Sequence, residues 1–329
     1  MLEHGGNLTA AAQHFGIART DWLDLSTGIN PHGYPVPEIP AMSWQRLPET
    51  DQVLEQAASA YYGTPHLLTI SGSQAAIQSL PRLRAHSRVT VLGPMYAEHA
   101  WAWQQQGHEV RQIATLPDAS TLDQTDVLLV CNPNNPSGRV IFPDTLLEWH
   151  AQLAHRGGWL LVDEAFMDST PQFSLATSVG KPGLIVLRSL GKFFGLAGAR
   201  VGFILAAPAL LTACEELLGP WPVSGPARFV AEIALSDTAW QTQTRYRLQT
   251  DSARLGKLLT QYGMSPSGST ALFQWLPMTN AAERQQQLAK LGIWTRFFNA
   301  QSALRMGLPE QHAWLRLETA LSQVQQSLT

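Results

Sequence analysis

Four segments of the chain place polar residues and glycines directly after an apolar run. In an open α/β sheet, ligands bind at the carboxyl ends of the strands, so residues at these positions are candidates for a site. The segments are SGSQAA after LLTI, NPNNPSG after DVLLVC, DEAF after WLLV, and SLGKFFGLAGARVGF after LIVLR. We therefore expect a lysine, a carboxylate, amides and hydroxyls to meet at one edge of a sheet.

The lysine of the last segment, Lys192, has neighbours that suit a chemical role. Phe193 and Phe194 would desolvate its amine, which favours the neutral and nucleophilic form. The hydroxyl of Ser189 and the guanidinium of Arg200 could hold a phosphate beside it. The pattern GxxxxGK[ST] does not surround the lysine, which excludes a Walker loop. The alternative is an ordinary solvated lysine in a glycine-rich loop.

Each of the other three segments, taken alone, is weaker evidence for a functional site. Asp163 in DEAF could be a helix cap or a turn residue, and NPNNPSG could be a double turn. SGSQAA is typical of a turn that opens a helix. The backbone amides of Gly72, Ser73 and Gln74 could bind a phosphate there, at the positive end of the helix.

SLGKFFGLAGARVGF resembles the lysine signature of fold-type I pyridoxal 5′-phosphate (PLP) enzymes, with a Ser three residues before the lysine and an Arg eight after it. This resemblance implies that Lys192 holds PLP as a Schiff base and carries protons. It also implies that Ser189 and Arg200 contact the cofactor phosphate. DEAF is similar to the segment whose aspartate, here Asp163, keeps the pyridine nitrogen protonated, so that the ring is a stronger electron sink.

The resemblance extends to the remaining segments. NPNNPSG is similar to the asparagine loop of the family, which implies that Asn135 bonds the phenolic oxygen of PLP and that Asn132 is structural. SGSQAA matches the phosphate loop of the family in place and order. GPMYAEH resembles its aromatic segment, which implies that Tyr96 stacks on the PLP ring, with a core tyrosine as the alternative.

The elements that must position these residues alternate along the chain from about Leu67. Apolar runs alternate with helical stretches, which predicts a sheet covered by helices on both faces, and several runs are apolar throughout, as in buried parallel strands. The expected fold class is α/β, and the resemblance implies the aspartate aminotransferase-like PLP fold with a large, mixed but mostly parallel sheet. The candidate strands are LLTI, VTVLG, EVRQI, DVLLVC, WLLVDEAF, LIVLRS and VGFILA.

We expect a large PLP-binding domain at residues 41–215 and a smaller α+β substrate-binding domain formed by residues 1–40 and 216–329. Pro and Gly cluster between Pro31 and Pro40, which predicts an irregular connection between the domains. Helical spacing of apolar residues predicts helices at 51–62, where Gly63 stops the helix, and at 244–263.

The composition is that of a globular protein, with 45% hydrophobic and 14% charged residues among 329. A net charge of -3 gives no general attraction to nucleic acid or to an anionic membrane. Cys131 and Cys214 lie in apolar contexts, which predicts buried thiols in a reducing cytoplasm. We expect neither a signal peptide nor a membrane-spanning segment, and the histidines lack the spacing of metal ligands.

The ends of the chain point to a substrate. HGGN near the start and DLSTGINPHGYP after it closely resemble the opening of threonine-phosphate decarboxylases, PLP enzymes of cobalamin biosynthesis, whereas the related histidinol-phosphate aminotransferases lack HGGN. The resemblance implies that His4 contacts the substrate phosphate and that the backbone N–H of Gly28 meets the substrate carboxylate. It also implies that Arg296 and Arg305 hold these two anionic groups. Surface residues and surface ion pairs are the alternatives.

Three positions depart from the pattern of the family. Leu47 replaces a tyrosine that reaches the cofactor phosphate of the partner subunit, which puts that contact in doubt. Phe166 replaces a tyrosine of many aminotransferases, so a hydroxyl near the phenolic oxygen of PLP is missing. Pro309 replaces a further arginine, so we expect phosphate binding to be rearranged.

The resemblance implies decarboxylation of L-threonine O-3-phosphate to (R)-1-amino-2-propanol O-2-phosphate, and a homodimer with active sites at the subunit interface. The same catalytic groups serve transamination, because the bond that stands perpendicular to the cofactor ring decides the reaction. The alternative is an aminotransferase acting on a phosphorylated amino compound such as histidinol phosphate. A third alternative is a non-catalytic binding protein of this fold. Against it stands the presence of all four predicted cofactor residues, Lys192, Asp163, Asn135 and Arg200.

Overall fold

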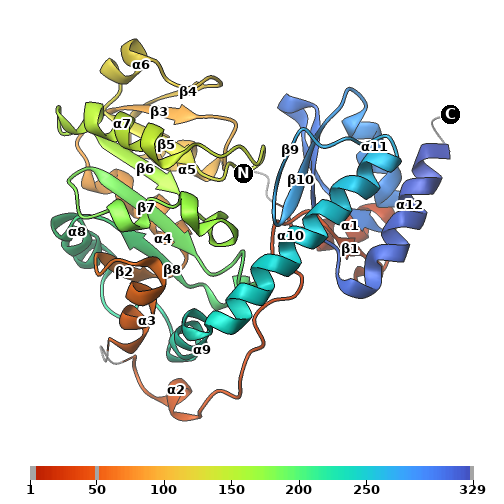
Figure 1. Ribbon diagram of the computed structural model, residues 1–329, viewed down its shortest axis with the longest axis horizontal. Helices are drawn as coiled ribbons and strands as arrows, with labels where there is room; N and C mark the ends of the chain where they lie inside the picture. The colour runs from red at the N-terminus through yellow and green to blue at the C-terminus, as the bar shows by residue number, and fades with distance from the viewer. Residues whose placement is uncertain (1–4, 49–51, 327–329) are drawn as a thin grey trace. The chain divides into compact units, whose positions relative to one another are not determined.

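The structure is a computed structural model of the chain, and it describes residues 5–48 and 52–326 (Figure 1). Contacts within the chain divide it into two compact units. The larger unit consists of Gly33–Asn135 and Val140–Thr242, and the smaller unit of Met1–His32, Pro136–Arg139 and Gln243–Thr329. Each unit has a sheet and a buried core of its own.

A seven-stranded sheet forms the centre of the larger unit. Its spatial order is β2-β8-β7-β6-β5-β3-β4, and every neighbouring pair is parallel except those of β8, which runs antiparallel to β2 and β7. All seven predicted strands are present, so the prediction of a mixed, mostly parallel sheet is confirmed. The strands are β2 (Leu67–Ile70), β3 (Arg88–Leu92), β4 (Glu109–Ile113), β5 (Val127–Cys131), β6 (Trp159–Asp163), β7 (Leu184–Ser189) and β8 (Gly202–Leu205).

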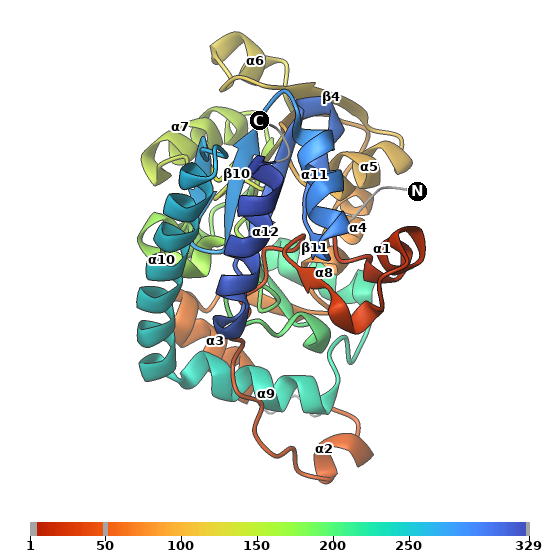
Figure 2. The same cartoon turned by 90° about the vertical axis from the view of Figure 1, so that its right-hand side faces the viewer.

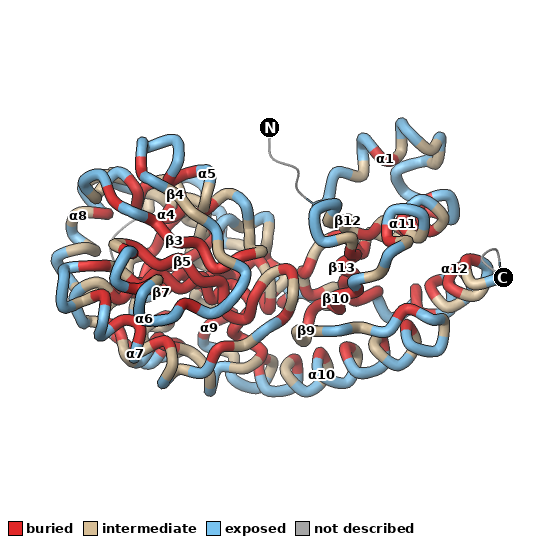
Figure 3. Tube along the Cα trace, turned by 90° about the horizontal axis from the view of Figure 1, so that it is seen from above, coloured by how far each residue is buried: buried red, intermediate tan, exposed pale blue. Residues whose placement is uncertain are grey.

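Helices cover both faces of this sheet, and Figure 3 shows the buried strands between the two helix layers. On one face, Leu129 and Ile185 of the sheet pack with Ile77 and Trp103 from the helices in one buried cluster. On the other face, α7 packs on β6. The helices of this unit are α2 (Met42–Gln45), α3 (Val53–Tyr62), α4 (Ser73–Ser79), α5 (Glu98–Gln105), α6 (Ala119–Asp123), α7 (Pro143–Ala154), α8 (Pro208–Leu218) and α9 (Gly225–Ser236).

The smaller unit is built on a four-stranded antiparallel sheet of order β12-β13-β10-β9, with a parallel pair formed by β1 and β11. This agrees with the α+β pattern expected for the end of the chain. The strands are β1 (Leu23–Asp24), β9 (Gly268–Thr270), β10 (Phe273–Pro277), β11 (Ile293–Trp294), β12 (Arg296–Phe298) and β13 (Ala303–Gly307), and the helices are α1 (Leu8–Phe15), α11 (Ala281–Lys290) and α12 (Trp314–Gln326).

One predicted helix begins earlier than expected. The helix predicted at 244–263 is α10 (Thr238–Gln261), which starts six residues before the predicted position. Asp237 explains this start, because its carboxylate accepts the backbone N–H of Trp240 at 2.9 Å and so caps the first turn. The helix predicted at 51–62 is observed as α3, and Gly63 ends it in a left-handed conformation with φ of 70°.

The compact units and the predicted domains divide the chain at different places. One boundary between the units falls at His32 and Gly33, inside the irregular segment from Pro31 to Pro40. A second falls within α10, after Thr242, so α9, whose Arg228 pairs with Glu55 of α3 at 2.8 Å, belongs to the larger unit. Two more enclose Pro136–Arg139, which belongs to the smaller unit. Assignment of cofactor binding and substrate binding to two domains stays a prediction. Within the described residues, none of the helices combines the length and apolar character that crossing a lipid bilayer requires.

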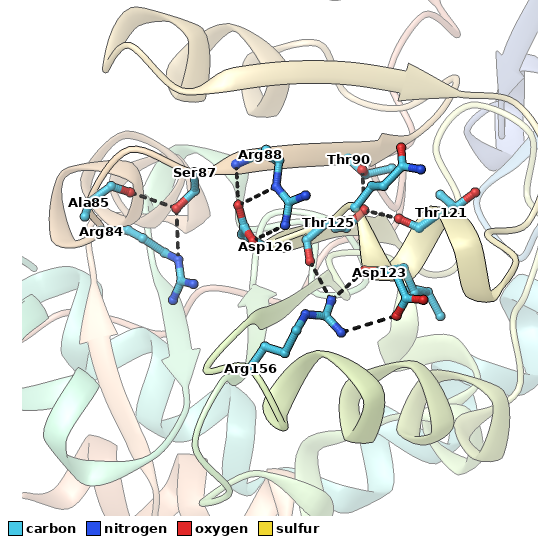
Figure 4. A network of polar contacts seen from close by, with 12 residues as sticks. Arg84, Ala85, Ser87, Arg88, Thr90, Thr121, Asp123, Thr125, Asp126 and Arg156 are labelled. Atoms are coloured by element: carbon cyan, nitrogen blue, oxygen red, sulfur yellow. Dashed lines mark hydrogen bonds and ion pairs between the residues drawn. The ribbon is translucent and has the colours of Figure 1, made fainter.

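A polar network joins the amino ends of β3 and β5, opposite the strand ends that carry the candidate residues (Figure 4). Arg88, the first residue of β3, forms two side-chain hydrogen bonds with Asp126, at 2.8 and 3.1 Å. Arg156 donates to the carbonyls of Leu122 and Thr125 at 2.7 and 3.2 Å. These contacts hold strand β5 in place at the end that faces away from the candidate residues.

A second charged cluster is fully buried beneath β6 and β7. The guanidinium of Arg188 forms ion pairs with Glu164, at 2.6 Å, and with Asp168. Glu164 also accepts the backbone N–H of Leu175 at 2.7 Å and the hydroxyl of Ser174 at 2.5 Å. Burial raises the pKa of the Glu164 carboxyl, against the opposing pull of Arg188. The cluster connects the turn after Asp163 to the strand that leads to Ser189.

We expect Arg188→Met to destabilise the fold severely, because it leaves two buried carboxylates without their cation. Loss of one partner of a buried ion pair costs about 3–5 kcal/mol. Arg88→Met is the matched control, because Arg88 forms an exposed pair that contributes at most about 1 kcal/mol. Urea denaturation of the three proteins measures the difference, and equal losses in both variants would show that the buried cluster contributes no special stability.

Candidate active site

The carboxyl ends of β5, β6 and β7 bring three predicted segments together in the larger unit. In the sheet register, Cys131 of β5 stands opposite Asp163 of β6, and Asp163 stands opposite Leu187 of β7. Asn132, which follows β5, donates its backbone N–H to the carbonyl of Asp163 at 2.9 Å. The asparagine loop, DEAF and the lysine loop therefore begin side by side at this edge of the sheet.

Asp163 is a buried carboxylate held by two hydrogen bonds. Its Oδ2 lies 2.9 Å from Nε2 of His99, a fully buried residue of α5, and its Oδ1 accepts the backbone N–H of Ala165 at 3.0 Å. Burial of a carboxylate is costly unless donors or a cation compensate its charge. The carboxylate is therefore placed to stabilise a cationic group beside it.

Tyr96 is tied to the turn after β2 through side-chain hydrogen bonds. Its hydroxyl donates to Oε1 of Gln74 at 3.3 Å, and Nε2 of Gln74 donates to Glu98 at 3.0 Å. The Tyr96 ring meets His99 edge to face, with 6.3 Å between ring centroids. Burial, followed by the neighbouring carboxylates of Glu98 and Asp163, raises the pKa of Tyr96 to about 12. Tyr96 is therefore a neutral phenol at physiological pH.

Ser189, Gly72 and Arg200 meet where β8 lies between β2 and β7. Gly202 of β8 stands opposite Ser189 in the sheet register. A Cβ on Gly202 would lie 2.7 Å from the backbone nitrogen of Ser73, and a Cβ on Gly72 would lie 2.8 Å from Nη2 of Arg200. Only glycine permits this packing, which gathers backbone amides, a hydroxyl and a guanidinium in one corner. Such a set of donors suits a phosphate.

Lys192 is half-buried in the loop between β7 and β8, and an aromatic ring lies near its amine. The Lys192 Nζ atom is 5.6 Å from the centroid of the Phe166 ring. Phe193 and Phe194 are fully buried and pack on Trp240, with centroid distances of 5.5 and 5.6 Å. Phe166, which replaces the tyrosine of many aminotransferases, thus contributes an apolar surface beside the amine.

The asparagine loop is closed by its first residue. The Asn132 side chain donates to the carbonyl of Ile141 at 3.0 Å and accepts the Ile141 N–H at 2.9 Å, which is a structural role. Asn134 donates to the carbonyl of Pro94 at 3.1 Å. Asn135 is half-buried at the end of the larger unit's first segment. Its contact with a cofactor oxygen stays a prediction.

In the smaller unit, the segment containing Gly28 lies against β13. Arg305 donates to the carbonyl of Ser26 at 2.6 Å, and the Gly307 N–H donates to the carbonyl of Leu25 at 2.7 Å. The carbonyl of Thr27 approaches Gly307 so closely that a Cβ there would collide with it. The backbone of Gly28 is thereby held next to Arg305.

The two predicted substrate arginines are direct neighbours in the smaller unit. Arg296 of β12 and Arg305 of β13 are opposite partners in an antiparallel pair. Side chains at such positions leave the sheet on the same side, with Cβ atoms about 5 Å apart. Two guanidiniums can therefore meet one ligand with two anionic groups. His4, the other predicted phosphate contact, lies outside the described residues.

Sequence reasoning missed His99, although a signal was present. His99 follows Tyr96 by three residues in GPMYAEH, and its backbone N–H donates to the Tyr96 carbonyl at 3.2 Å where α5 begins. Its bond to Asp163 joins residues 64 positions apart, which no local pattern shows. The Glu164, Arg188 and Asp168 cluster was missed for the same reason.

A lysine loop beside a buried aspartate, at the strand ends of a mixed sheet, defines a protein of the aspartate aminotransferase fold. The family model for aminotransferase class I and II matches residues 20–325. The chain belongs to this family. An aspartate aminotransferase from Thermus thermophilus superposes with a TM-score of 0.75, at 17% identity, over 98% of this chain and 96% of its own, which confirms the predicted fold.

Two further comparisons point to particular relatives. A Pseudomonas aeruginosa protein named threonine-phosphate decarboxylase is 56% identical over 322 residues, which cover 98% of this chain and 97% of the relative. The structure of a histidinol-phosphate aminotransferase from Sinorhizobium meliloti in complex with pyridoxal 5′-phosphate has a TM-score of 0.80 at 20% identity, over 98% of this chain and 96% of its own.

We expect His99→Phe to destabilise the protein, because it removes the donor to the buried Asp163 carboxylate. An unsatisfied buried acceptor costs about 1–3 kcal/mol. His99→Gln keeps a donor and should lose less. His86→Phe, at an exposed position, is the control and should change stability by no more than about 0.5 kcal/mol. If urea denaturation gives equal losses of unfolding free energy for His99→Phe and His86→Phe, His99 does not stabilise the protein through Asp163.

The raised pKa of Tyr96 predicts a late phenol titration. The neutral form is favoured in the folded protein, so this stabilisation is complete below the ordinary tyrosine pKa and is lost as the pH rises through about 12. The difference between ultraviolet titrations of the wild type and Tyr96→Phe should show a tyrosinate midpoint near pH 12. A midpoint near the ordinary value of about 10 would contradict it.

Proposed function

We propose that the protein is a PLP-dependent threonine-phosphate decarboxylase, a carboxy-lyase that converts L-threonine O-3-phosphate to (R)-1-amino-2-propanol O-2-phosphate in cobalamin biosynthesis. The observation that carries the proposal is the 56% identity, along nearly the whole chain, to a relative with that name. The predicted cofactor residues of the larger unit and the paired arginines of the smaller unit support it.

The residues at the strand ends of the larger unit fit PLP. The corner formed by Ser189, Arg200 and the turn from Gly72 to Gln74 offers donors to a phosphate, and glycines leave it open where a Cβ would intrude. Lys192 supplies the amine that holds the aldehyde group. The remaining proposed contacts are Asp163 to the ring nitrogen, Tyr96 to the ring face and Asn135 to the phenolic oxygen.

PLP held by these residues would supply an electron sink for the substrate bond that breaks. The Asp163 carboxylate, fixed by His99, stabilises the proton on the ring nitrogen and so strengthens this effect. Lys192 returns a proton to the substrate Cα after CO2 leaves. Tyr96 does not act as a phenolate base, because its raised pKa keeps the phenol neutral.

Substrate orientation decides which bond breaks, and we assign it to the smaller unit. Arg296 and Arg305 bind the phosphate and the carboxylate of the substrate, and the backbone N–H of Gly28 contacts the carboxylate. His4 contacts the phosphate. Holding both anionic groups fixes the carboxylate as the leaving group, and such positioning contributes a large part of the rate in enzymes.

The purified protein, supplied with PLP and threonine phosphate, should release CO2 without a requirement for 2-oxoglutarate. Glutamate formed from 2-oxoglutarate without CO2 would instead identify an aminotransferase of a phosphorylated amino compound such as histidinol phosphate. Lys192→Ala should lower the rate by about 10²–10⁴-fold, because the proton carrier is lost. Lys181→Ala, at an exposed position of the same unit, should retain the full rate.

We also propose a homodimer. In the larger unit, α2 lies beside α9 (Figure 2). On α2 and next to it in sequence, Val36, Met42, Trp44 and Leu47 are each more than half exposed. Exposed apolar residues that cluster in this way are typical of a protein interface. The resemblance of the segment around Leu47 to one that reaches the partner subunit favours a second copy of the chain as the partner.

Trp44→Asp should weaken this dimer, because it places a charge in the apolar surface. Analytical ultracentrifugation should show a wild-type dimer and a larger monomer fraction for the variant. Leu315→Asp is the control, because Leu315 is 75% exposed but lies on α12 of the smaller unit. A monomeric wild type, or equal dissociation of both variants, would contradict the proposed interface.

We place the protein in the reducing cytoplasm. Neither Cys131 nor Cys214 forms a disulfide, both are buried, and burial raises the pKa of Cys214 to about 11. A thiol with such a pKa stays protonated and resists oxidation. Cell fractionation tests this location directly.

A further inference from the structure

One face of the four-stranded sheet in the smaller unit carries both arginines and three aromatic rings. Trp275, Arg305 and Arg296 stand at directly opposite positions on β10, β13 and β12, so their side chains leave the sheet on the same side. Phe273 and Phe298 lie two residues from Trp275 and Arg296, so they share this face. The positions across from these two phenylalanines on β13 are Gly307 and Ala303, whose small side chains leave room for the rings.

Phe298 contacts both cations. The guanidinium carbon of Arg296 lies 5.5 Å from the centroid of the Phe298 ring, and that of Arg305 lies 6.0 Å from it. A cation within about 6 Å of a ring centroid is attracted by the charge distribution of the ring. Trp275 fixes the ring from the side, edge to face, with 5.1 Å between centroids.

A ring shared by both guanidiniums offsets two costs of the arginine pair, the repulsion between like charges and the loss of side-chain entropy on binding. Two like charges at directly opposite positions repel each other, and long side chains keep many rotamers in solution. Arg305 is already held by the Ser26 carbonyl at 2.6 Å and by the Phe273 ring, 5.3 Å from its guanidinium carbon. The Phe298 ring therefore restricts mainly the less buried Arg296, and keeps it beside Arg305 before the ligand arrives. A site whose groups are already restricted loses less entropy on binding.

We propose that Phe298 is a positioning residue that holds Arg296 and Arg305 side by side for a substrate with two anionic groups. The inference rests on the proposed function, since that function assigns both arginines to the substrate. Phe298 itself touches the guanidiniums and not the reacting bond. Its loss should therefore raise KM much more strongly than it lowers kcat.

Phe298→Leu tests the proposal, with Phe298→Trp as the conservative replacement that keeps an aromatic face. Phe297→Leu is the matched control, because Phe297 is equally half-buried on the same strand but stands opposite Leu304, on the other face of the sheet. Phe298→Met, which also lacks a ring, gives the same comparison should the leucine variant fail to fold. Thermal unfolding of each holoenzyme establishes that it is folded.

Binding is measured by calorimetry on the holoenzyme with 3-phosphoglycerate, which carries a phosphate and a carboxylate but no amine and so cannot react. We expect Phe298→Leu to raise the Kd of this probe, and the KM for threonine phosphate, about tenfold. The kcat should stay within about twofold of the wild type. Phe298→Trp and Phe297→Leu should bind the probe nearly as the wild type does.

Equal Kd values for Phe298→Leu and Phe297→Leu would overturn the proposal, as would an equal loss in Phe298→Leu and Phe298→Trp. A fall in kcat with no change in KM would overturn it as well. Failure of the proposed function is recognised separately, in the wild type, by the absence of CO2 from threonine phosphate. The calorimetric comparison of the variants still tests Phe298 in that case.

Discussion

The burial of one carboxylate at the end of a strand constrains the larger unit more than any other single feature. A carboxylate as buried as that of Asp163 costs free energy unless donors or a cation compensate its charge. His99 and the backbone N–H of Ala165 supply the donors. The order β5-β6-β7 places the asparagine loop and the lysine loop on either side of the carboxylate. The strand order thus decides which loops can meet at Asp163.

The single antiparallel strand of the sheet, β8, brings together two of the segments predicted to bind the cofactor. Because β8 returns between β2 and β7, Gly202 stands beside Ser189 and against the turn at Gly72 and Ser73. The buried ion pairs of Arg188 join the turn after Asp163 to the same strand that ends in Ser189. Ser189 and Asp163 are therefore linked through buried contacts of neighbouring strands, and such support is what a proposed cofactor site needs to hold its ligand in one orientation.

Local patterns were enough for the strands and for the residues after them. The seven apolar runs and the segments around Lys192, Asp163 and Gly72 are each contiguous in sequence, so their place at the strand ends follows from strand order alone. What depends on distant partners was not predictable. The bond between His99 and Asp163 depends on how α5 packs on the sheet. The cap at Asp237 that starts α10 early is, by contrast, a local signal that the helix prediction missed. The pairing of Arg296 with Arg305 requires the register of two strands, which composition does not reveal.

Borohydride trapping tests most directly whether Lys192 holds the cofactor. Reduction fixes PLP irreversibly to the lysine that carries it, and mass spectrometry of the digested protein identifies the modified peptide. A pyridoxyl group confined to the peptide containing Lys192 is the predicted result. A protein that binds PLP but carries no label after reduction, or carries it on a different lysine, would contradict the assignment.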